Sequence, residues 1–168
     1  MKTHVIMLSK NFLAKHPKKG QLTYFKTKFL NAQDAAKGIV PADEDLRLNH
    51  AFKKHTLRKN LPYWKHIFEE ITRGEACLSV REWSGRPRRS AAVEIKRLTA
   101  NDGISLQELR FIPDLSGKGY YVTIDGTQVS ADIIANNDGL SFADWSAWFK
   151  DVDKSQPLAV IQFTQFRY

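Results

Sequence analysis

The segment that decides the fold class is Ala76-Cys-Leu-Ser-Val80, Trp83-Ser-Gly-Arg-Pro-Arg-Arg89 and Ala91-Ala-Val-Glu-Ile95. Two apolar runs of strand length flank a loop that contains Gly85 and Pro87, which is typical of a β-hairpin. Hairpin strands are antiparallel neighbours, and no regular alternation of strands and helices surrounds them. The sequence therefore predicts an α+β fold rather than a doubly wound parallel sheet.

Further strands are expected on both sides of this hairpin, because short apolar runs alternate with turns that contain Gly and Asp. They are residues 4–8, 106–112, 120–124 and 158–163, with a short cationic strand at 53–59. Five or six such strands, interrupted by helices, predict a small mixed β-barrel surrounded by helices. At 168 residues, the chain is expected to form a single domain over residues 1–168.

Two helices are expected where apolar residues recur three and four positions apart. One lies within residues 22–35, with Gly38 as its stop signal, and the other contains Tyr63 to Ile71 and ends at Gly74. The acidic run Asp43 to Asp45 is expected in a turn or at a helix start.

A third helix is expected from the spacing of Ser141 and Asp144, which is that of a capping box. The apolar residues that follow the cap are large aromatics. We expect this helix to bury Phe142, Trp145, Trp148 and Phe149.

The single cysteine, Cys77, excludes an internal disulfide and any zinc site built from several cysteines. No apolar run has the length of a membrane-spanning helix, and the run at residues 5–8 is too short for a signal peptide. The expectation is a cytoplasmic monomer that uses no cofactor and binds no membrane.

Positive charge is concentrated in the first part of the chain. The net charge is +8, and residues 1–60 carry 13 basic and 4 acidic side chains. Residues 101–168 carry 5 basic and 9 acidic side chains. Such a polarised distribution favours a cationic face for a polyanion. The alternative is a surface whose charge only keeps the protein in solution.

The segment Lys53-Lys-His-Thr-Leu-Arg58 places a hydroxyl among cations. In a strand, Lys54, Thr56 and Arg58 share one face, and a bend can bring Lys53 to the same side. A lysine near other cations has a lowered pKa and can act as a base. Arginine offers phosphate or carbonyl oxygens a planar fork of donors. A solvated edge strand is the simpler interpretation of the same residues.

Two further features carry functional expectations. Glu94 alternates with apolar neighbours in its strand, and it faces either solvent or, in a closed barrel, the cationic segment, where it can serve as an acid or base. The loop after Val80 combines an aromatic with three arginines, which suits base stacking and phosphate contacts. The expected nucleic-acid contacts are Lys54, Lys59, Trp83, Arg86, Arg88 and Arg89.

The chain resembles the ASCH family of the PUA-like superfamily, within a subgroup of bacterial and phage-borne relatives. Lys53-Lys-His-Thr-Leu-Arg58 is similar to the family's lysine followed by Thr-x-Arg, and Ala92-Val-Glu-Ile95 to its glutamate-bearing strand. Residues 140–149 and 158–163 are similar to its closing helix and strand. The resemblance covers roughly residues 25–168, which makes the N-terminal strand and helix, residues 1–50, a family-variable extension.

The resemblance implies a small β-barrel, an association with RNA and a set of site residues. Some ASCH proteins are amidohydrolases that remove the acetyl group of N4-acetylcytidine. By position, the implied roles are Thr56 as nucleophile, Lys53 as its activator, Glu94 as acid/base and Arg58 as the ligand of substrate oxygens. Lys54 competes with Lys53 for the lysine role.

The sequence is therefore compatible with three functions. The first is an RNA- or nucleotide-binding domain with a cationic pocket. The second is a hydrolase that acts on a modified nucleoside or on single-stranded RNA, and the third is a protein-interaction module. The partner expected in the first two cases is RNA or a modified nucleoside.

Overall fold

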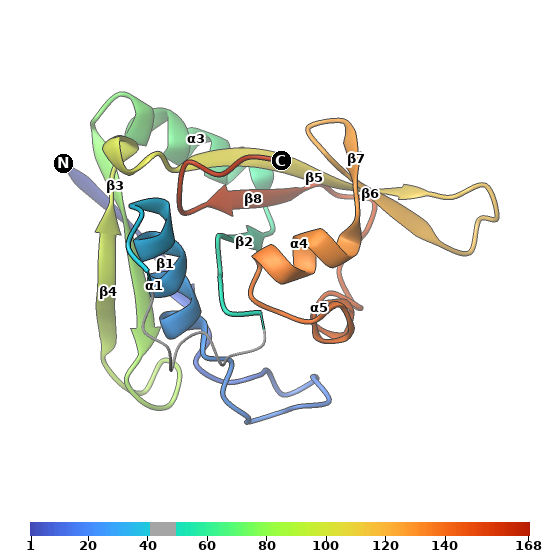
Figure 1. The fold of residues 1–168 in the computed structure, drawn as a ribbon, viewed down its shortest axis with the longest axis horizontal. Helices are drawn as coiled ribbons and strands as arrows, with labels where there is room; N and C mark the ends of the chain where they lie inside the picture. Colours follow the sequence, from blue (N-terminus) through green and yellow to red (C-terminus); the bar gives the residue numbers. More distant parts are fainter. Residues whose placement is uncertain (41–49) are drawn as a thin grey trace.

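Two β-sheets organise the computed structural model, which describes residues 1–40 and 50–168 (Figure 1). The smaller sheet has the order β1-β3-β4, formed by Lys2–Leu8, Ala76–Trp83 and Ala92–Leu98. Strand β1 is parallel to β3, and β3 is antiparallel to β4. The hairpin predicted at the Trp83–Arg89 loop is thereby confirmed.

The larger sheet is antiparallel throughout and has the order β2-β8-β5-β6-β7. Its strands are β2 (His55–Arg58), β5 (Ser105–Pro113), β6 (Tyr120–Ile124), β7 (Thr127–Val129) and β8 (Leu158–Gln162). Strands and helices together make the fold α+β, as predicted.

The prediction of a closed barrel is wrong, because the described strands form two open sheets. Both sheets stay open, because β2 and β7 are edges of one sheet, and β1 and β4 are edges of the other. Helix α1 (Phe25–Ala36) connects the sheets instead. Its Gln33 accepts a hydrogen bond from Lys96 on β4 (2.7 Å) and donates one to the carbonyl of Phe163, just after β8 (2.6 Å).

The helices confirm the main sequence expectations. Helix α1 is followed by Gly38 at φ 74°, and α3 (Leu61–Thr72) by Gly74 at φ 75°, both in the left-handed region that favours glycine. Helix α5 (Phe142–Trp148) begins at Ser141, whose hydroxyl accepts the Asp144 N–H at 3.1 Å. The expectation that α5 buries all four aromatics is wrong, because Phe142 is 47% exposed.

Two stretches of regular structure were not predicted, and the shorter one is the 3-10 helix Ala100–Asp102. Strand β7 and helix α4 (Ala131–Asn137) fill the sequence between Gly126 and Ser141, where no element was expected. The acidic run at 43–45, expected in a turn or helix start, lies outside the described residues.

The hydrophobic core is continuous across both sheets. Ile6 and Leu8 of β1 and Phe25 and Phe29 of α1 belong to the same cluster of buried side chains as the strands of the larger sheet. The N-terminal strand and helix therefore contribute to the core. Within the described ranges, no helix combines the length and the apolar character needed to cross a membrane.

Candidate functional site

The cationic segment enters the larger sheet with a bend before the strand. Strand β2 pairs with β8, whereas Lys53 lies just outside it and forms an isolated bridge with Asp138. The Lys53 N–H also donates to the carbonyl of Lys28 at 2.9 Å. This bend directs the Lys53 side chain toward the side occupied by Thr56 and Arg58, as the sequence had suggested.

Lys53 is buried and forms an ion pair with Asp138, which follows helix α4. Its Nζ also donates to the Asp138 carbonyl at 2.9 Å and lies 4.0 Å from the centre of the Phe25 ring. Burial lowers the pKa of Lys53, and the neighbouring Asp138 carboxylate opposes that shift. Burial likewise raises the pKa of Asp138. No sequence pattern indicated Asp138, because it follows a helix that the sequence did not predict.

Arg58 connects the two sheets beside this ion pair. Its guanidinium donates to the Thr56 hydroxyl at 3.1 Å, to the Leu57 carbonyl at 3.0 Å and, across to β1, to the Met7 carbonyl at 2.5 Å. Lys53, Thr56, Arg58 and Asp138 all line one cavity of about 20 Å³, which has room for about one water molecule. Three of the four predicted catalytic residues therefore lie together.

Glu94, the fourth, lies elsewhere. It is an exposed residue of β4 that accepts hydrogen bonds from Ser79 and from Arg97 (3.2 Å) and lies 3.7 Å from Arg81. The hydrogen bond from Ser79 lowers its pKa. Ser79 pairs with Val5, which is 47% exposed, so Glu94 lies on the outer face of the smaller sheet. The barrel that would have turned Glu94 toward the cationic segment does not form.

Lys54 diverges from Lys53, although the two are neighbours. Its Nζ lies 4.6 Å from the centre of the Phe166 ring, and it does not line the cavity. Of the two candidate lysines, Lys53 is thus the one that shares a cavity with Thr56.

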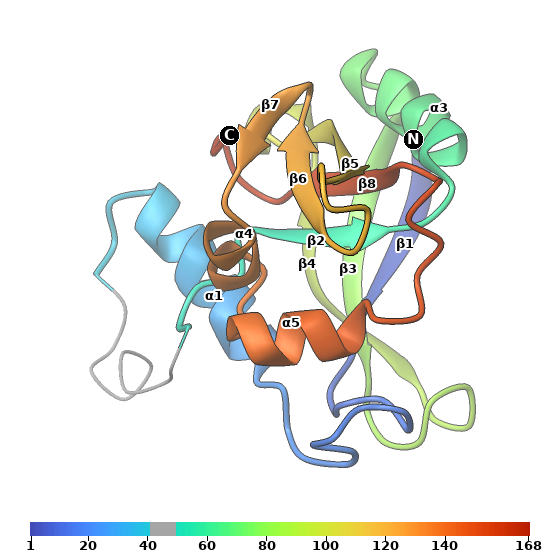
Figure 2. The same cartoon turned by 90° about the vertical axis from the view of Figure 1, so that its right-hand side faces the viewer.

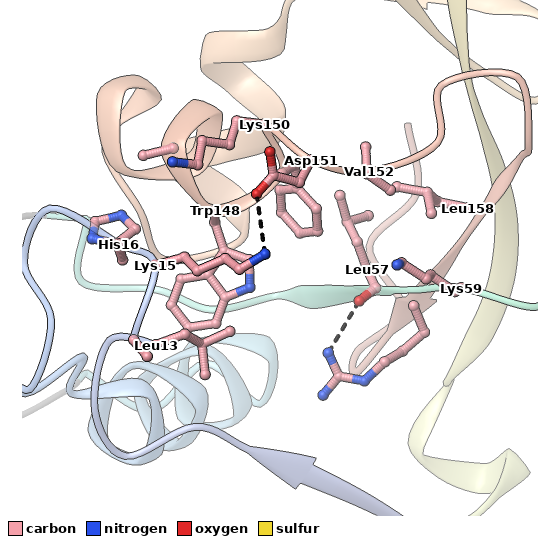
Figure 3. Close-up of a pocket in the computed structure, with 14 residues that line it drawn as sticks. Leu13, Lys15, His16, Leu57, Lys59, Trp148, Lys150, Asp151, Val152 and Leu158 are labelled. Atoms are coloured by element: carbon pink, nitrogen blue, oxygen red, sulfur yellow. Dashed lines mark hydrogen bonds and ion pairs between the residues drawn. The ribbon is translucent and has the colours of Figure 1, made fainter.

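A larger cleft opens beside this cavity, with a volume of about 490 Å³ (Figure 3). Arg58, Trp148 and Phe149 line both spaces. Its apolar part includes Leu13, Leu57, Trp148, Phe149, Val152 and Leu158, and its cations are Lys15, Arg58, Lys59 and Lys150. Asp151 is the acidic residue among the described lining residues, and its carboxylate lies 3.9 Å from Lys15 Nζ. The cleft thus combines an apolar surface with an excess of positive charge.

His16 fixes one wall of the cleft. Its Nδ1 accepts the Lys18 N–H at 3.0 Å, so its Nε2 carries the proton and donates to the carbonyl of Asp144 on α5 at 3.0 Å. The ring stacks on Phe12 with centroids 4.4 Å apart. These contacts hold the loop at residues 9–24 against α5. No sequence spacing had singled out His16.

The interior near the cleft carries uncompensated positive charge. Lys28 is 8% exposed, its Nζ donates to the Gly139 carbonyl at 2.8 Å, and burial together with Lys53 lowers its pKa to about 8. Lys28, Lys53 and Arg58 are thus three cations facing two carboxylates, Asp138 beside Lys53 and Arg58, and Asp144 near Lys28. Such an imbalance produces a positive potential that attracts anions to the neighbouring cleft.

The predicted nucleic-acid contacts lie in three places. Lys54 lies against Phe166 and does not line the cleft. Lys59 lines the cleft. Trp83 ends β3, and the arginines after it occupy the β3–β4 turn, which is ordered by hydrogen bonds from Ser90 to the Arg86 carbonyl (2.8 Å) and from the Gly85 N–H to Ser90 (3.0 Å). Arg86, Arg88 and Arg89 are exposed, and none of them forms an ion pair with a described carboxylate.

Metal-binding geometry is absent from the described part of the chain, where no three His, Cys, Asp or Glu side chains are grouped to hold an ion. Comparison of the chain with protein-family models, curated proteins and solved structures finds no match.

Proposed function

We propose that this chain binds single-stranded RNA, or a single nucleotide, in the cleft between β2, α5 and the loop at residues 9–24. The observation that carries the proposal is the composition of the cleft wall. Four cations surround an apolar surface, and the one acidic lining residue, Asp151, lies beside Lys15.

A nucleotide matches this composition because it joins a flat apolar base to a negative phosphate. Trp148 and Leu13 supply apolar surface for a base, and Lys59 and Lys150 are exposed cations for phosphate. The buried lysines behind the wall add long-range attraction for the anion. The resemblance of the Lys53–Arg58 segment to the ASCH family supports the same class of ligand.

The test is a titration of a fluorescently labelled oligouridylate followed by anisotropy at several salt concentrations. If Lys59 and Lys150 each neutralise one phosphate, Lys59→Gln and Lys150→Gln should each reduce the slope of log K against log salt by about 0.7. Lys37→Gln removes the same charge from the exposed end of α1 and serves as the control. Equal slopes in all three variants would exclude the cleft as the binding site.

A second candidate function is hydrolysis of an N4-acylated cytidine, and it is favoured by the cavity that Lys53, Thr56 and Arg58 share. In this proposal the Thr56 hydroxyl attacks the acyl carbon and gives up its proton, the C–N bond breaks, and the leaving amine takes up that proton. Water then hydrolyses the acyl-threonine ester. In this proposal Asp138, rather than Glu94, is the carboxylate that assists, and its ion pair with Lys53 supports that role.

Mass spectrometry of reactions with N4-acetylcytidine tests this candidate. We expect turnover by the wild type, loss of turnover in Thr56→Val and unchanged turnover in Glu94→Gln. Absence of turnover by the wild type would reject the hydrolase and leave the binding proposal standing.

A further inference from the structure

A second hollow, of about 230 Å³, lies on the other flank of α5 from the cleft. Phe142, Trp145 and Phe149 recur at helical spacing on the flank of α5 that lines the hollow, whereas Ala147 and Trp148 line the cleft. Figure 2 shows α5 beneath the β6 end of the larger sheet. The residues that line the hollow include members of both elements.

The opposite wall of the hollow is the sheet. In the pairing of β5 with β6, Phe111 is opposite Val122 and Pro113 is opposite Tyr120, which places Phe111 and Tyr120 on the same face. Their ring centroids are 6.5 Å apart. Phe111 is buried, with its centroid 6.3 Å from that of Trp145, but Tyr120 remains 51% exposed.

Two exposed aromatic rings thus reach solvent from opposite walls, Tyr120 from the sheet and Phe142 from α5. Exposed aromatic side chains around a hollow are typical of a binding surface. Their flat faces suit a planar, apolar group such as a nucleobase, which stacks on aromatic rings whatever its identity.

The charge of the lining residues indicates that the occupant is also anionic. Lys150 and Lys154 line the hollow, and no acidic residue is among the described residues that do. Lys154 Nζ lies 5.7 Å from the ring centres of both Phe111 and Tyr120, so a cation is held directly over the aromatic surface. An occupant that is both planar and anionic complements this hollow.

Because Phe149 and Lys150 line both the hollow and the cleft, the two spaces share a wall. We infer that the hollow is a second nucleotide subsite for the same RNA strand. One base occupies the cleft and the next stacks between Tyr120 and Phe142, with the intervening phosphate at Lys150. This inference rests on the proposed function of the cleft and extends the recognised ligand to at least two nucleotides.

The test measures the affinity of two ligands for the variants Tyr120→Ala, Phe142→Ala and Tyr121→Ala. The first ligand is a labelled uridine tetranucleotide, and the second is uridine monophosphate, measured by competition. Tyr121 is the matched control, because it is the next residue of β6, is 39% exposed and faces the opposite side of the sheet. We expect Tyr120→Ala and Phe142→Ala to weaken tetranucleotide binding roughly tenfold, as the loss of one base–aromatic stack does. Mononucleotide binding should change less than about twofold in every variant.

Tetranucleotide affinities within about twofold of wild type in both Tyr120→Ala and Phe142→Ala would overturn the second subsite while the cleft proposal stands. An equal loss in Tyr121→Ala would also overturn it, because the effect would then not depend on the hollow. If the wild type bound neither ligand, the cleft proposal would fail and the second subsite with it.

Discussion

At the scale of single residues, the buried pair of Lys53 and Asp138 is the feature with the largest energetic consequence. Both side chains are almost fully buried, with exposed fractions of 1% and 4%. Removing ions from water costs several kcal/mol for each ion, and only close pairing offsets that cost. The pair therefore stabilises the bend before β2 only while both partners are present.

Lys53→Met is expected to lower the free energy of unfolding by about 3–5 kcal/mol, because it leaves the Asp138 carboxylate buried without its partner. The double variant Lys53→Met/Asp138→Leu should lose less than the single variant, since no charge remains buried. Urea denaturation measures both, with Lys54→Met as a neighbouring control expected to lose about 1 kcal/mol or less. Losses that simply add in the double variant would show that the pair is not coupled.

At the scale of elements, regular patterns were predictable and short ones were not. Helices α1 and α3 have apolar residues at helical spacing over twelve residues and end before a glycine, so the sequence alone located them. Strand β7 has three residues and α4 has seven, too few for a periodic pattern to stand out. Helix α5 also has seven residues, but the capping-box spacing of Ser141 and Asp144 located it.

The same limit decided how much of the candidate site was predictable. Lys53, Thr56 and Arg58 are close in sequence, and one bend brings them together. Asp138 reaches them only through α4, a contact across 85 residues that no local pattern reveals. The position of Glu94 depended on whether the sheets close, which is a property of long-range pairing.

Another element-scale contact attaches α3 to β1. Glu70 of α3 accepts hydrogen bonds from Lys2 and, at 2.7 Å, from His4, and His66 lies at 3.6 Å. The bonds from Lys2 and His4 lower the pKa of Glu70 from its ordinary 4.5 to about 2. The Glu70 carboxylate therefore takes up a proton at a higher pH in the unfolded chain than in the folded protein. The stabilisation is complete above about pH 4.5 and is lost as the pH falls toward 2.

We expect thermal unfolding of Glu70→Gln to depend less on pH than that of the wild type across this range. Glu69→Gln, an exposed neighbour on the same helix, should follow the wild-type curve. Identical pH dependence in wild type and Glu70→Gln would contradict the proposed linkage between α3 and β1.

At the scale of the whole molecule, the positive charge divides between the cleft and the β3–β4 turn. The turn lies at the same end of the molecule as the loop at residues 9–24, which forms part of the cleft wall (Figures 1 and 2). If the cleft binds RNA as proposed, a short RNA occupies the cleft alone, whereas a longer strand also reaches the arginines of the turn.

Replacing Arg86, Arg88 and Arg89 together by Gln is therefore expected to weaken binding of a 20-nucleotide RNA and to reduce its salt slope by up to about 2, or 0.7 for each phosphate contact. Binding of a tetranucleotide should not change. Anisotropy titrations with both lengths measure this difference, and Lys37→Gln again controls for net charge. Equal effects on the tetranucleotide and the 20-nucleotide RNA would argue against a binding surface that extends from the cleft to the turn.

The pairing of β2 with β8 has a consequence for the time course of folding. Residues 55–58 hydrogen-bond to residues 159–162, about a hundred positions later in the chain. Pairing at such separation closes a long loop before it yields any contact, which makes folding slow. During synthesis, the residues of β2, which include Thr56 and Arg58, therefore have no β8 to pair with until β8 has left the ribosome. The cleft is thus a late product of folding, and a chain truncated before β8 would lack it, because Leu158 of β8 is part of its wall.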